Sequence, residues 1–294
     1  MKYTIVFACC LIIGHTQLIC AQEIDTSAVC EICITAKHRM PNPYRLSFKH
    51  EVPFLVVSTG VLTSGILAQV WNKKGSLNAE DIDRLDREDI FFLDRSSALN
   101  NSSQSASYSD FFRSAVTFFP VYFLSNHYTK QDIGPLVVMS VEVFSMTFGL
   151  TNIAKNVIRR PRPFTYNPDV PLEDKVKKDA KRSFFSGHTS HTAAFSFFMA
   201  KVITDYHPEA KKGLKIFFWS FAATIPAVTA YLRVRAGRHF PTDVIAGYLT
   251  GAMVGYFIPH LHLRKNRKSP ISFSPLIYDN YTGLSMTIRL GQNR

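Results

Sequence analysis

The residues best suited to chemistry lie in one stretch late in the chain, from Arg233 to Asp243. His239 precedes Asp243 by four residues, where an apolar helix is predicted to begin. Four residues make about one helical turn, so the carboxylate of Asp243 can reach the imidazole. An aspartate on one ring nitrogen fixes the tautomer and leaves the other nitrogen free to react. Arg233, Arg235 and Arg238 crowd the same stretch, which favours an anionic ligand.

Taken alone, this stretch is equally consistent with a basic loop that leads into the N-terminus of a helix. Two further motifs favour the chemical interpretation. The first runs from Lys155 to Arg162, at the end of an apolar segment. The second is Ser186-Gly187-His188, which precedes another apolar segment. Free backbone N–H groups at a helix N-terminus suit a phosphate group, and Gly187 lets the backbone approach the anion closely.

Apolar segments of helical length position these motifs. The predicted fold is all-α, a six-helix antiparallel bundle embedded in a membrane, because several segments are long enough to span one. In such a bundle the third helix ends, the fourth begins, the fifth ends and the sixth begins at the same end, so the motifs can converge. Glycines in the last segment would let it pack closely against a neighbour. The six predicted helices cover residues 53–71, 114–126, 133–154, 189–204, 216–232 and 244–259.

Together these residues resemble the three-part signature of the type 2 phosphatidic acid phosphatase and vanadium haloperoxidase superfamily. That signature reads Lys-x6-Arg-Pro, Pro-Ser-Gly-His and Ser-Arg-x5-His-x3-Asp. The first part is matched in full, from Lys155 to Pro163. In the second part Phe185 replaces the proline, and in the third Leu232 replaces the serine. Both departures are at non-catalytic positions, and the resemblance covers roughly residues 110–260.

The resemblance implies a metal-independent phosphatase that works through a phosphohistidine intermediate. His239 would attack phosphorus, with Asp243 stabilising its imidazolium form. His188 would protonate the leaving alcohol and then activate water. No metal or cofactor is required, because no carboxylate cluster lies near the motifs. The expected phosphate-binding groups are the side chains of Lys155, Arg162 and Arg233 and the backbone near Ser186 and Gly187.

Other ionisable residues near the motifs have simpler interpretations. His191, one helical turn after His188, is interpreted as a packed or capping histidine. Glu142 lies inside an apolar segment and is expected to pair with a partner in the bundle. Four arginines are interpreted as solvated loop charges that could also meet an anionic lipid headgroup. They are Arg159, Arg160, Arg235 and Arg238.

The two ends of the chain lie outside the predicted bundle. Residues 1–21 have the basic start, the apolar core and the small residue before the cut site that are typical of a secretory signal peptide. Residues 22–52 form a predicted surface segment, whose Cys-x-x-Cys pair would form a local disulfide or stay as two free thiols. The bundle domain covers residues 53–262, and residues 263–294 form a basic linker and a predicted β-hairpin.

The formal net charge of +12 favours an anionic partner. No nucleic-acid-binding signature is present. The predicted partners are therefore a membrane and a phospholipid or other lipid phosphate, such as phosphatidate, an isoprenyl diphosphate or a lipid A phosphate. The alternative is a soluble periplasmic acid phosphatase with the same helical core. A vanadium-dependent haloperoxidase is a further alternative, since vanadate resembles phosphate.

Two observations on membrane topology conflict. A cleaved signal peptide followed by six crossings would place the motifs on the inner side of the membrane. However, Lys211, Lys212 and the basic run 264–268 lie at the opposite end of the predicted bundle and would favour the cytoplasm themselves. The conflict would be resolved if the second predicted helix, residues 114–126, did not cross the membrane, or if the helices formed a domain that spans no membrane. We therefore predict a multi-pass protein of the cell envelope whose active site faces the periplasm.

Overall fold

The computed structural model describes residues 6–9, 42–46, 48–71, 76–125, 127–130, 132–264, 271–278 and 281–288. The chain divides into two units, one made of residues 40–264 and the other of both chain ends, 1–39 and 265–294. Apart from residues 6–9, the predicted signal peptide lies outside the described residues, as do Cys30 and Cys33.

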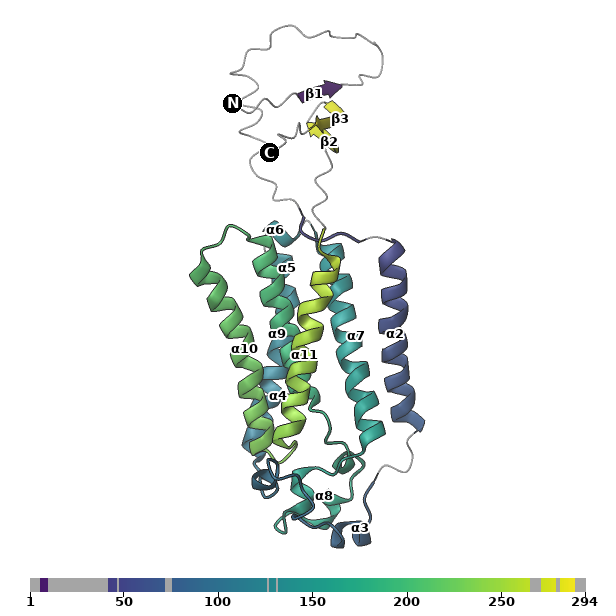
Figure 1. Ribbon diagram of the computed structural model, residues 1–294, viewed down its shortest axis with the longest axis vertical. Helices are drawn as coiled ribbons and strands as arrows, with labels where there is room; N and C mark the ends of the chain where they lie inside the picture. The colour runs from purple at the N-terminus through teal and green to yellow at the C-terminus, as the bar shows by residue number, and fades with distance from the viewer. Residues whose placement is uncertain are drawn as a thin grey trace. The chain divides into compact units, whose positions relative to one another are not determined.

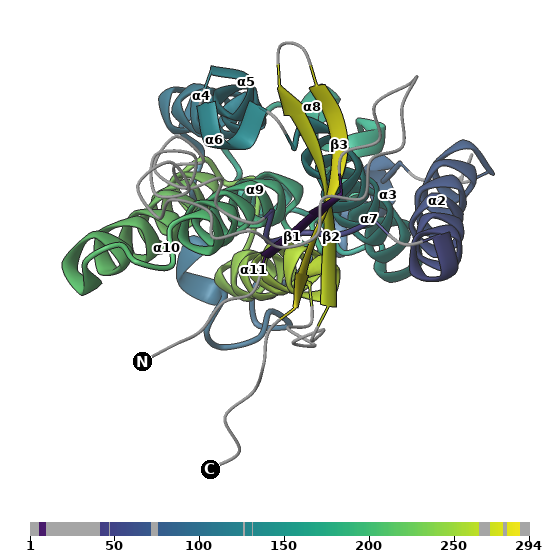
Figure 2. The same ribbon diagram turned by 90° about the horizontal axis from the view of Figure 1, so that it is seen from above.

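The unit made of the chain ends contains a three-stranded antiparallel sheet in the order β1-β3-β2. β2 (Ile271–Tyr278) and β3 (Tyr281–Ile288) form a hairpin, in which Ile271 is paired with Ile288. β1 (Val6–Cys9) pairs with the other edge of β3. Figure 2 shows the two long strands of the hairpin side by side.

The helical unit is an antiparallel bundle, in which successive long helices run in opposite directions (Figure 1). This arrangement confirms the predicted all-α class. Six of the described helices have 15 residues or more. They are α2 (Phe48–Trp71), α4 (Ser103–Thr117), α7 (Ile133–Ile158), α9 (Gly187–Tyr206), α10 (Lys212–Arg235) and α11 (Pro241–His262). The connections contain α3 (Ala79–Asp83), η1 (Arg95–Ser97), η2 (Phe119–Val121), α5 (Tyr122–Ser125), α6 (His127–Lys130), η3 (Pro163–Tyr166), α8 (Leu172–Lys175) and η4 (Lys178–Lys181).

The second long helix is displaced from its predicted position. The sequence predicts a helix over residues 114–126, whereas α4 begins at Ser103 and ends at Thr117. A Ser/Asn-rich stretch such as residues 96–109 is typical of a loop, but its second half starts this helix, because the Oγ of Ser102 accepts a backbone N–H of the first turn. Pro120 has no N–H to donate, and the chain beyond Thr117 continues as the short turns η2 and α5.

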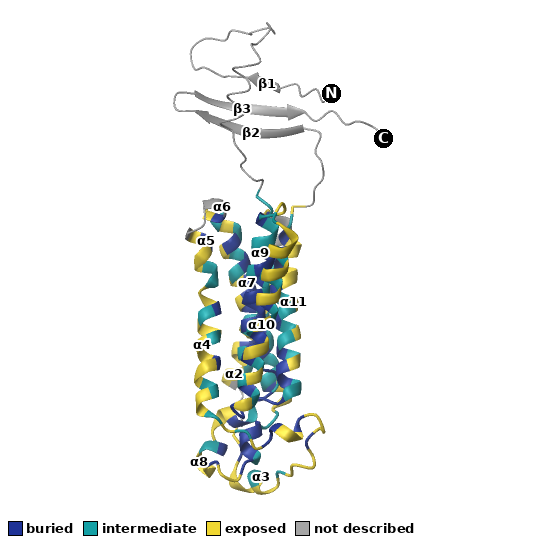
Figure 3. Cartoon of the chain, turned by 90° about the vertical axis from the view of Figure 1, so that its left-hand side faces the viewer, coloured by how far each residue is buried: buried dark blue, intermediate teal, exposed yellow. Residues whose placement is uncertain are grey.

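α9 is the central helix of the bundle. It packs against α11, α10, α7 and α4, and Figure 3 shows the buried residues gathered along the middle of the unit. The ring of Phe198 on α9 is fully buried and meets the ring of Phe123 edge-on. Leu136 and Val143 of α7 belong to the same apolar cluster. The core therefore lies around α9, while α2 packs on the outside against α7.

α11 approaches α9 closely through its glycines, as the sequence predicts. A Cβ added at Gly251 would lie 2.0 Å from the carbonyl oxygen of Ser190, and one added at Gly255 would lie 2.1 Å from that of Ala194. A side chain at either position would therefore push the two helices apart. This contact fixes the N-terminus of α11 relative to that of α9, which matters because both ends carry predicted site residues.

Four segments of the described chain are long and apolar enough to span a membrane: Val52–Val70, Ile133–Tyr166, Lys212–Arg235 and Pro241–His262. The sequence predicts six helices in the bundle, and the long helices α4 and α9 are the two that are absent from these four candidate spans. α4 is short and rich in serine. α9 is shielded by its neighbours and carries an internal ion pair, in which the Nζ of Lys201 lies 2.6 Å from a carboxylate oxygen of Asp205.

Candidate active site

The helix ends that carry the predicted site residues meet at one end of the bundle, the lower end in Figure 1. α7 and α10 end there, and α9 and α11 begin there. Antiparallel packing thus brings distant parts of the sequence together, as the order of the helices predicts. The predicted site residues at this end are Lys155, Arg162, Ser186, Gly187, His188, Arg233, His239 and Asp243.

His239 lies in the turn between α10 and α11 and is completely buried. Its Nδ1 atom lies 2.7 Å from the main-chain carbonyl oxygen of Ser183. Because a carbonyl oxygen only accepts, the proton of the neutral ring must be on Nδ1. The Nε2 atom is also buried, and no described residue forms a hydrogen bond with it. The ring therefore presents an unshared electron pair at Nε2.

Positive side chains surround this ring. Burial, followed by the charges of Arg162, Lys155 and Arg233, holds the pKa of His239 well below its usual range. The imidazole is consequently neutral near pH 7 and can act as a nucleophile without first losing a proton. Its surroundings also attract an anion, because three cations lie near a neutral ring.

Asp243 supports the ring indirectly. Its carboxylate lies 3.9 Å from Nδ1 of His239, too far for a hydrogen bond. One oxygen accepts from the Oγ of Ser183 at 2.5 Å and from the N–H of Phe240 at 2.9 Å. The sequence suggests that Asp243 fixes the tautomer of His239. In the structure the Ser183 carbonyl fixes it instead. Asp243 holds Ser183 in place and keeps its negative charge near the ring.

Arg160 is half-buried, which corrects its interpretation as a solvated loop charge. One guanidinium nitrogen, Nη1, lies 2.7 Å from Asp243, and Nη2 lies 2.7 Å from Asp94. The guanidinium also lies 4.1 Å above the ring of Phe240. Asp94 is fully buried and accepts the N–H of Thr242 at 3.0 Å. Arg160 therefore connects the segment before α4 to the first turn of α11.

The motif residues at the start of α9 are largely used by the fold itself. The Oγ of Ser186 caps the helix by accepting the N–H of Thr189 at 3.4 Å, and the N–H of Ser186 donates to the Asp243 carbonyl at 3.0 Å. A Cβ added at Gly187 would lie 3.1 Å from the Cγ2 of Thr151 and 3.7 Å from the Nζ of Lys155. Glycine at this position therefore lets the start of α9 lie close to the end of α7.

Two of the cations already contact carboxylates. Arg162 is almost completely buried and directs Nη2 to the carboxylate of Asp179, 2.8 Å away. Burial raises the pKa of Asp179, but the charges of Arg162 and Lys155 outweigh it and leave this pKa below its usual value. The Nη1 atom of Arg233 lies 3.5 Å from a carboxylate oxygen of Asp110 and 3.2 Å from the Oγ of Ser109. Its buried Nε has no hydrogen-bonding partner among the described residues.

His188 is the second residue of α9 and faces α4. Its Nε2 lies 2.6 Å from a carboxylate oxygen of Asp110. Burial, followed by the charges of Arg233 and Arg113, lowers the pKa of His188. His191, one turn further on, lies 3.1 Å from the Oγ1 of Thr117 and packs against the ring of Phe195.

Sequence reasoning assigned no role to Ser183, Arg160, Asp94 or Asp110. Arg160 lies between Lys155 and Arg162 and so belongs to the first motif, but its partner Asp94 is 66 residues away. Within the described residues, no group of three His, Cys, Asp or Glu side chains lies close enough to hold a metal ion.

Comparison with known proteins places these motifs in a family. The model of the PAP2 superfamily matches residues 136–267, which include all the predicted site residues. A lipid A 4'-phosphatase of Porphyromonas gingivalis is 29% identical over 114 residues, 37% of this chain and 43% of that protein. A lipid A 4'-phosphatase of Bacteroides thetaiotaomicron is 27% identical over 177 residues, 55% of this chain and 75% of that protein.

Two crystal structures are also similar. A transmembrane PAP2-type phosphatidylglycerolphosphate phosphatase from Bacillus subtilis has a TM-score of 0.45 and 17% identity, covering 74% of this chain and 98% of that chain. Aquifex aeolicus LpxE has a TM-score of 0.37 and 25% identity, covering 57% of this chain and 95% of that chain. The match to the PAP2 superfamily model spans all three motifs, so the region of the chain that carries them, residues 136–267, belongs to the PAP2 superfamily.

Proposed function

We propose that the protein hydrolyses a phosphate monoester or diphosphate of a membrane lipid through a phosphohistidine on His239. The observation that carries this proposal is the Nε2 atom of His239. It is buried, without a partner and unprotonated, and it lies near the cations Lys155, Arg162 and Arg233. A buried nitrogen with a free electron pair costs free energy unless a ligand uses it. A phosphate group satisfies both the nitrogen and the cations.

The first half-reaction transfers the phosphoryl group to the protein. Lys155, Arg162 and Arg233 hold the non-bridging oxygens, and Nε2 of His239 forms a bond to phosphorus. The P–O ester bond breaks, its electron pair stays on the leaving oxygen, and His188 supplies the proton that makes this oxygen an alcohol. The nearby Asp243 carboxylate stabilises the positive charge that develops on the ring.

The second half-reaction returns the protein to its starting state. His188, now neutral, accepts a proton from water while the water oxygen forms a bond to phosphorus. The N–P bond breaks and its electron pair returns to Nε2 of His239. Inorganic phosphate is released, and His188 again carries a proton for the next substrate.

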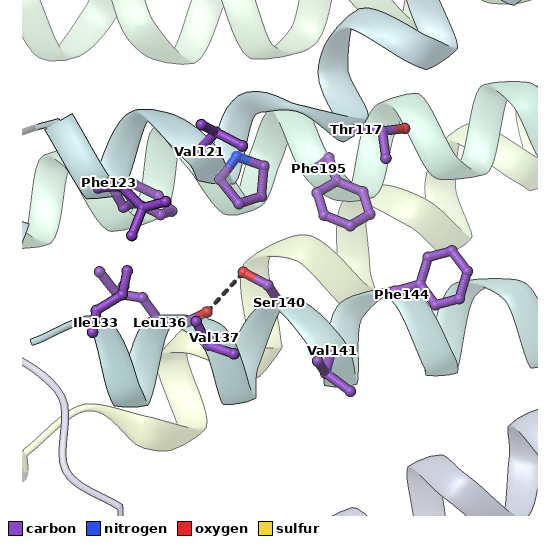
Figure 4. A pocket seen from close by; sticks show the side chains of 12 residues that line it. Thr117, Val121, Phe123, Ile133, Leu136, Val137, Ser140, Val141, Phe144 and Phe195 are labelled. Carbon is purple, nitrogen blue, oxygen red and sulfur yellow. Dashed lines mark hydrogen bonds between the residues drawn. The ribbon is translucent and has the colours of Figure 1, made fainter. Parts of the chain in front are cut away.

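An apolar groove supports a lipid as the source of the phosphate. It has a volume of ≈370 Å³ and lies between α7 and the segment from α4 to α5 (Figure 4). Phe144 and Phe195 line it, and so does Thr117, which contacts His191 one turn from His188. The groove thus approaches the site from the side of the bundle, where an acyl chain could lie while its phosphate reaches His239.

The relatives named above favour a lipid A phosphate as the substrate within this class. We further propose that the site faces the periplasm and that the four candidate spans embed the bundle in a membrane. Phosphatidate, an isoprenyl diphosphate and water-soluble phosphate esters are the alternatives. A preference for the soluble esters would favour a soluble acid phosphatase.

The test is phosphate release by protein purified in detergent, measured on each of these substrates. Wild-type protein should release phosphate from a lipid substrate, and His239→Ala and His188→Ala should lower turnover about 100-fold or more. Brief incubation with substrate labelled in its phosphate, followed by alkaline denaturation, should leave an acid-labile label on wild type and none on His239→Ala. Wild-type turnover in both variants would rule out the mechanism.

A further inference from the structure

Two adjacent residues of α4 reach two different helices at the site. The carboxylate of Asp110 lies 2.6 Å from Nε2 of His188 on α9 and 3.5 Å from Nη1 of Arg233 on α10. The Oγ of Ser109 accepts from the same Arg233 nitrogen at 3.2 Å. Asp110 belongs to none of the three motifs, because α4 precedes them in the sequence.

Stability does not account for this contact. The side chain of Asp110 is 57% exposed and that of His188 is 20% exposed. Exposed ion pairs contribute little to folding, typically less than about 1 kcal/mol. A contact of this kind therefore needs another explanation.

The proposed reaction supplies one, because its first half needs a proton on His188. The charges of Arg233 on α10 and Arg113 on α4 disfavour a positive charge on this ring, as do His239 and Lys155. Asp110 is the carboxylate within hydrogen-bonding distance of the ring. It can accept from an Nε2–H group, and this hydrogen bond leaves Nδ1 as the nitrogen that exchanges a proton with the substrate.

We propose that Asp110 is a positioning residue for His188, which orients the ring and stabilises its protonated form so that the leaving oxygen receives a proton. This inference rests on the proposed phosphatase function. In the step concerned, the P–O bond breaks, the electron pair stays on the leaving oxygen, and the proton moves from His188 to that oxygen. A competing interpretation is that the Asp110 carboxylate occupies the phosphate site and inhibits the protein.

The two interpretations differ in how they respond to the leaving group. An alkoxide needs a proton to leave, whereas p-nitrophenolate leaves without one near neutral pH. We therefore compare kcat/KM, which covers the steps up to phosphohistidine formation, on dihexanoyl phosphatidate and on p-nitrophenyl phosphate. Asp110→Asn should lower kcat/KM about 10- to 100-fold on the phosphatidate and less than about threefold on p-nitrophenyl phosphate.

A double-mutant cycle tests whether Asp110 acts through His188. If it does, adding Asp110→Asn to His188→Ala should cause no further loss on the phosphatidate. Asp174→Asn removes a carboxylate from an exposed pair with Lys177 and should keep wild-type rates on both substrates.

Three results would overturn the proposal: equal losses on the two substrates, an undiminished loss in the His188→Ala background, or a gain in kcat/KM. The last would support an inhibitory carboxylate. Failure of the proposed function itself looks different, because wild-type protein would then release phosphate from neither substrate, or from p-nitrophenyl phosphate alone.

Discussion

The Nδ1 atom of His239 lies 2.7 Å from the main-chain carbonyl oxygen of Ser183. This carbonyl belongs to the residue whose Oγ donates to Asp243 at 2.5 Å. The proposed nucleophile and the carboxylate of the last motif are thus connected through a residue 56 positions before the histidine. The arrangement orients the ring without bringing a full negative charge into direct contact with it.

Asp243→Asn should disrupt this connection. The amide has one oxygen where the carboxylate has two, so one of the donors Arg160, Ser183 and Phe240 N–H would face an NH₂ group. We expect the free energy of unfolding to fall by about 2–4 kcal/mol, because buried charged partners lose their acceptor. We expect kcat to fall about 100-fold, because the Ser183 carbonyl shifts relative to the ring. Denaturation in detergent and steady-state kinetics measure the two effects.

Asp94→Asn is the matched control for this prediction. Asp94 is also fully buried and also binds Arg160, but its other contacts are to Thr242 and not to Ser183. The Asp94→Asn variant should lower the free energy of unfolding by a similar amount, with a much smaller effect on kcat. If both variants reduced kcat equally at a temperature where both are folded, Asp243 would act only through Arg160.

The sequence predicts well which helix ends meet, because the motifs combine residue type with helix order. Lys155 and His239 follow apolar segments and His188 precedes one. Because the direction of these segments alternates, their convergence requires no knowledge of side-chain packing. The supporting contacts could not be predicted in this way. The partners of Arg160 lie 66 and 83 residues away, and nothing in the spacing selects Asp94 over neighbouring acids.

The position of α4 shows a second limit of the sequence. Apolar content predicts a helix over residues 114–126, whereas the cap at Ser102 starts α4 about three turns earlier. Ser109 and Asp110 of α4 face the site, and Thr117 at the end of the helix lines the groove. The contact of Asp110 with His188 becomes visible only when α4 lies beside α9.

Protonation of His239 should make the protein less stable in acid. Burial and nearby cations lower the pKa of this ring in the folded state, while the unfolded chain has an ordinary value of about 6.5. The unfolded state therefore binds more protons as the pH falls below that value. The stability that the neutral ring contributes is fully present above pH 6.5. It is lost as the pH falls towards the pKa of the folded state, by at most about 1.4 kcal/mol per pH unit. Unfolding free energies from pH 7.5 to 5 should show a smaller slope for His239→Gln than for wild type. Equal slopes would contradict a neutral buried ring.

Asp179 should compete with phosphate for Arg162. Its carboxylate stays ionised at neutral pH and takes up the Nη2 group that would face a phosphate oxygen. Because Asp179 is 61% exposed, the competition is weak, and we expect Asp179→Asn to lower the Ki of inorganic phosphate about two- to fivefold. Asp174→Asn, which changes a carboxylate on the same connecting segment, should leave Ki unchanged. A higher Ki in Asp179→Asn would show that Asp179 orients Arg162 for phosphate instead of competing with it.

Gly251→Ala should separate α11 from α9. The added methyl group would lie 2.0 Å from the carbonyl oxygen of Ser190, a backbone atom that cannot turn aside. We expect a loss of about 1–3 kcal/mol in the free energy of unfolding. Because α9 carries His188 and α11 carries Asp243 near their touching ends, kcat should fall as well, even at temperatures where the variant is folded.

Gly213→Ala is the matched control, since nothing lies within 4 Å of a Cβ at that position in the first turn of α10. It should leave activity unchanged and raise stability by up to about 1 kcal/mol, because alanine favours a helix more than glycine does. Equal stability of the two variants would mean that α9 and α11 can move apart at no cost, and that their spacing does not hold the site together.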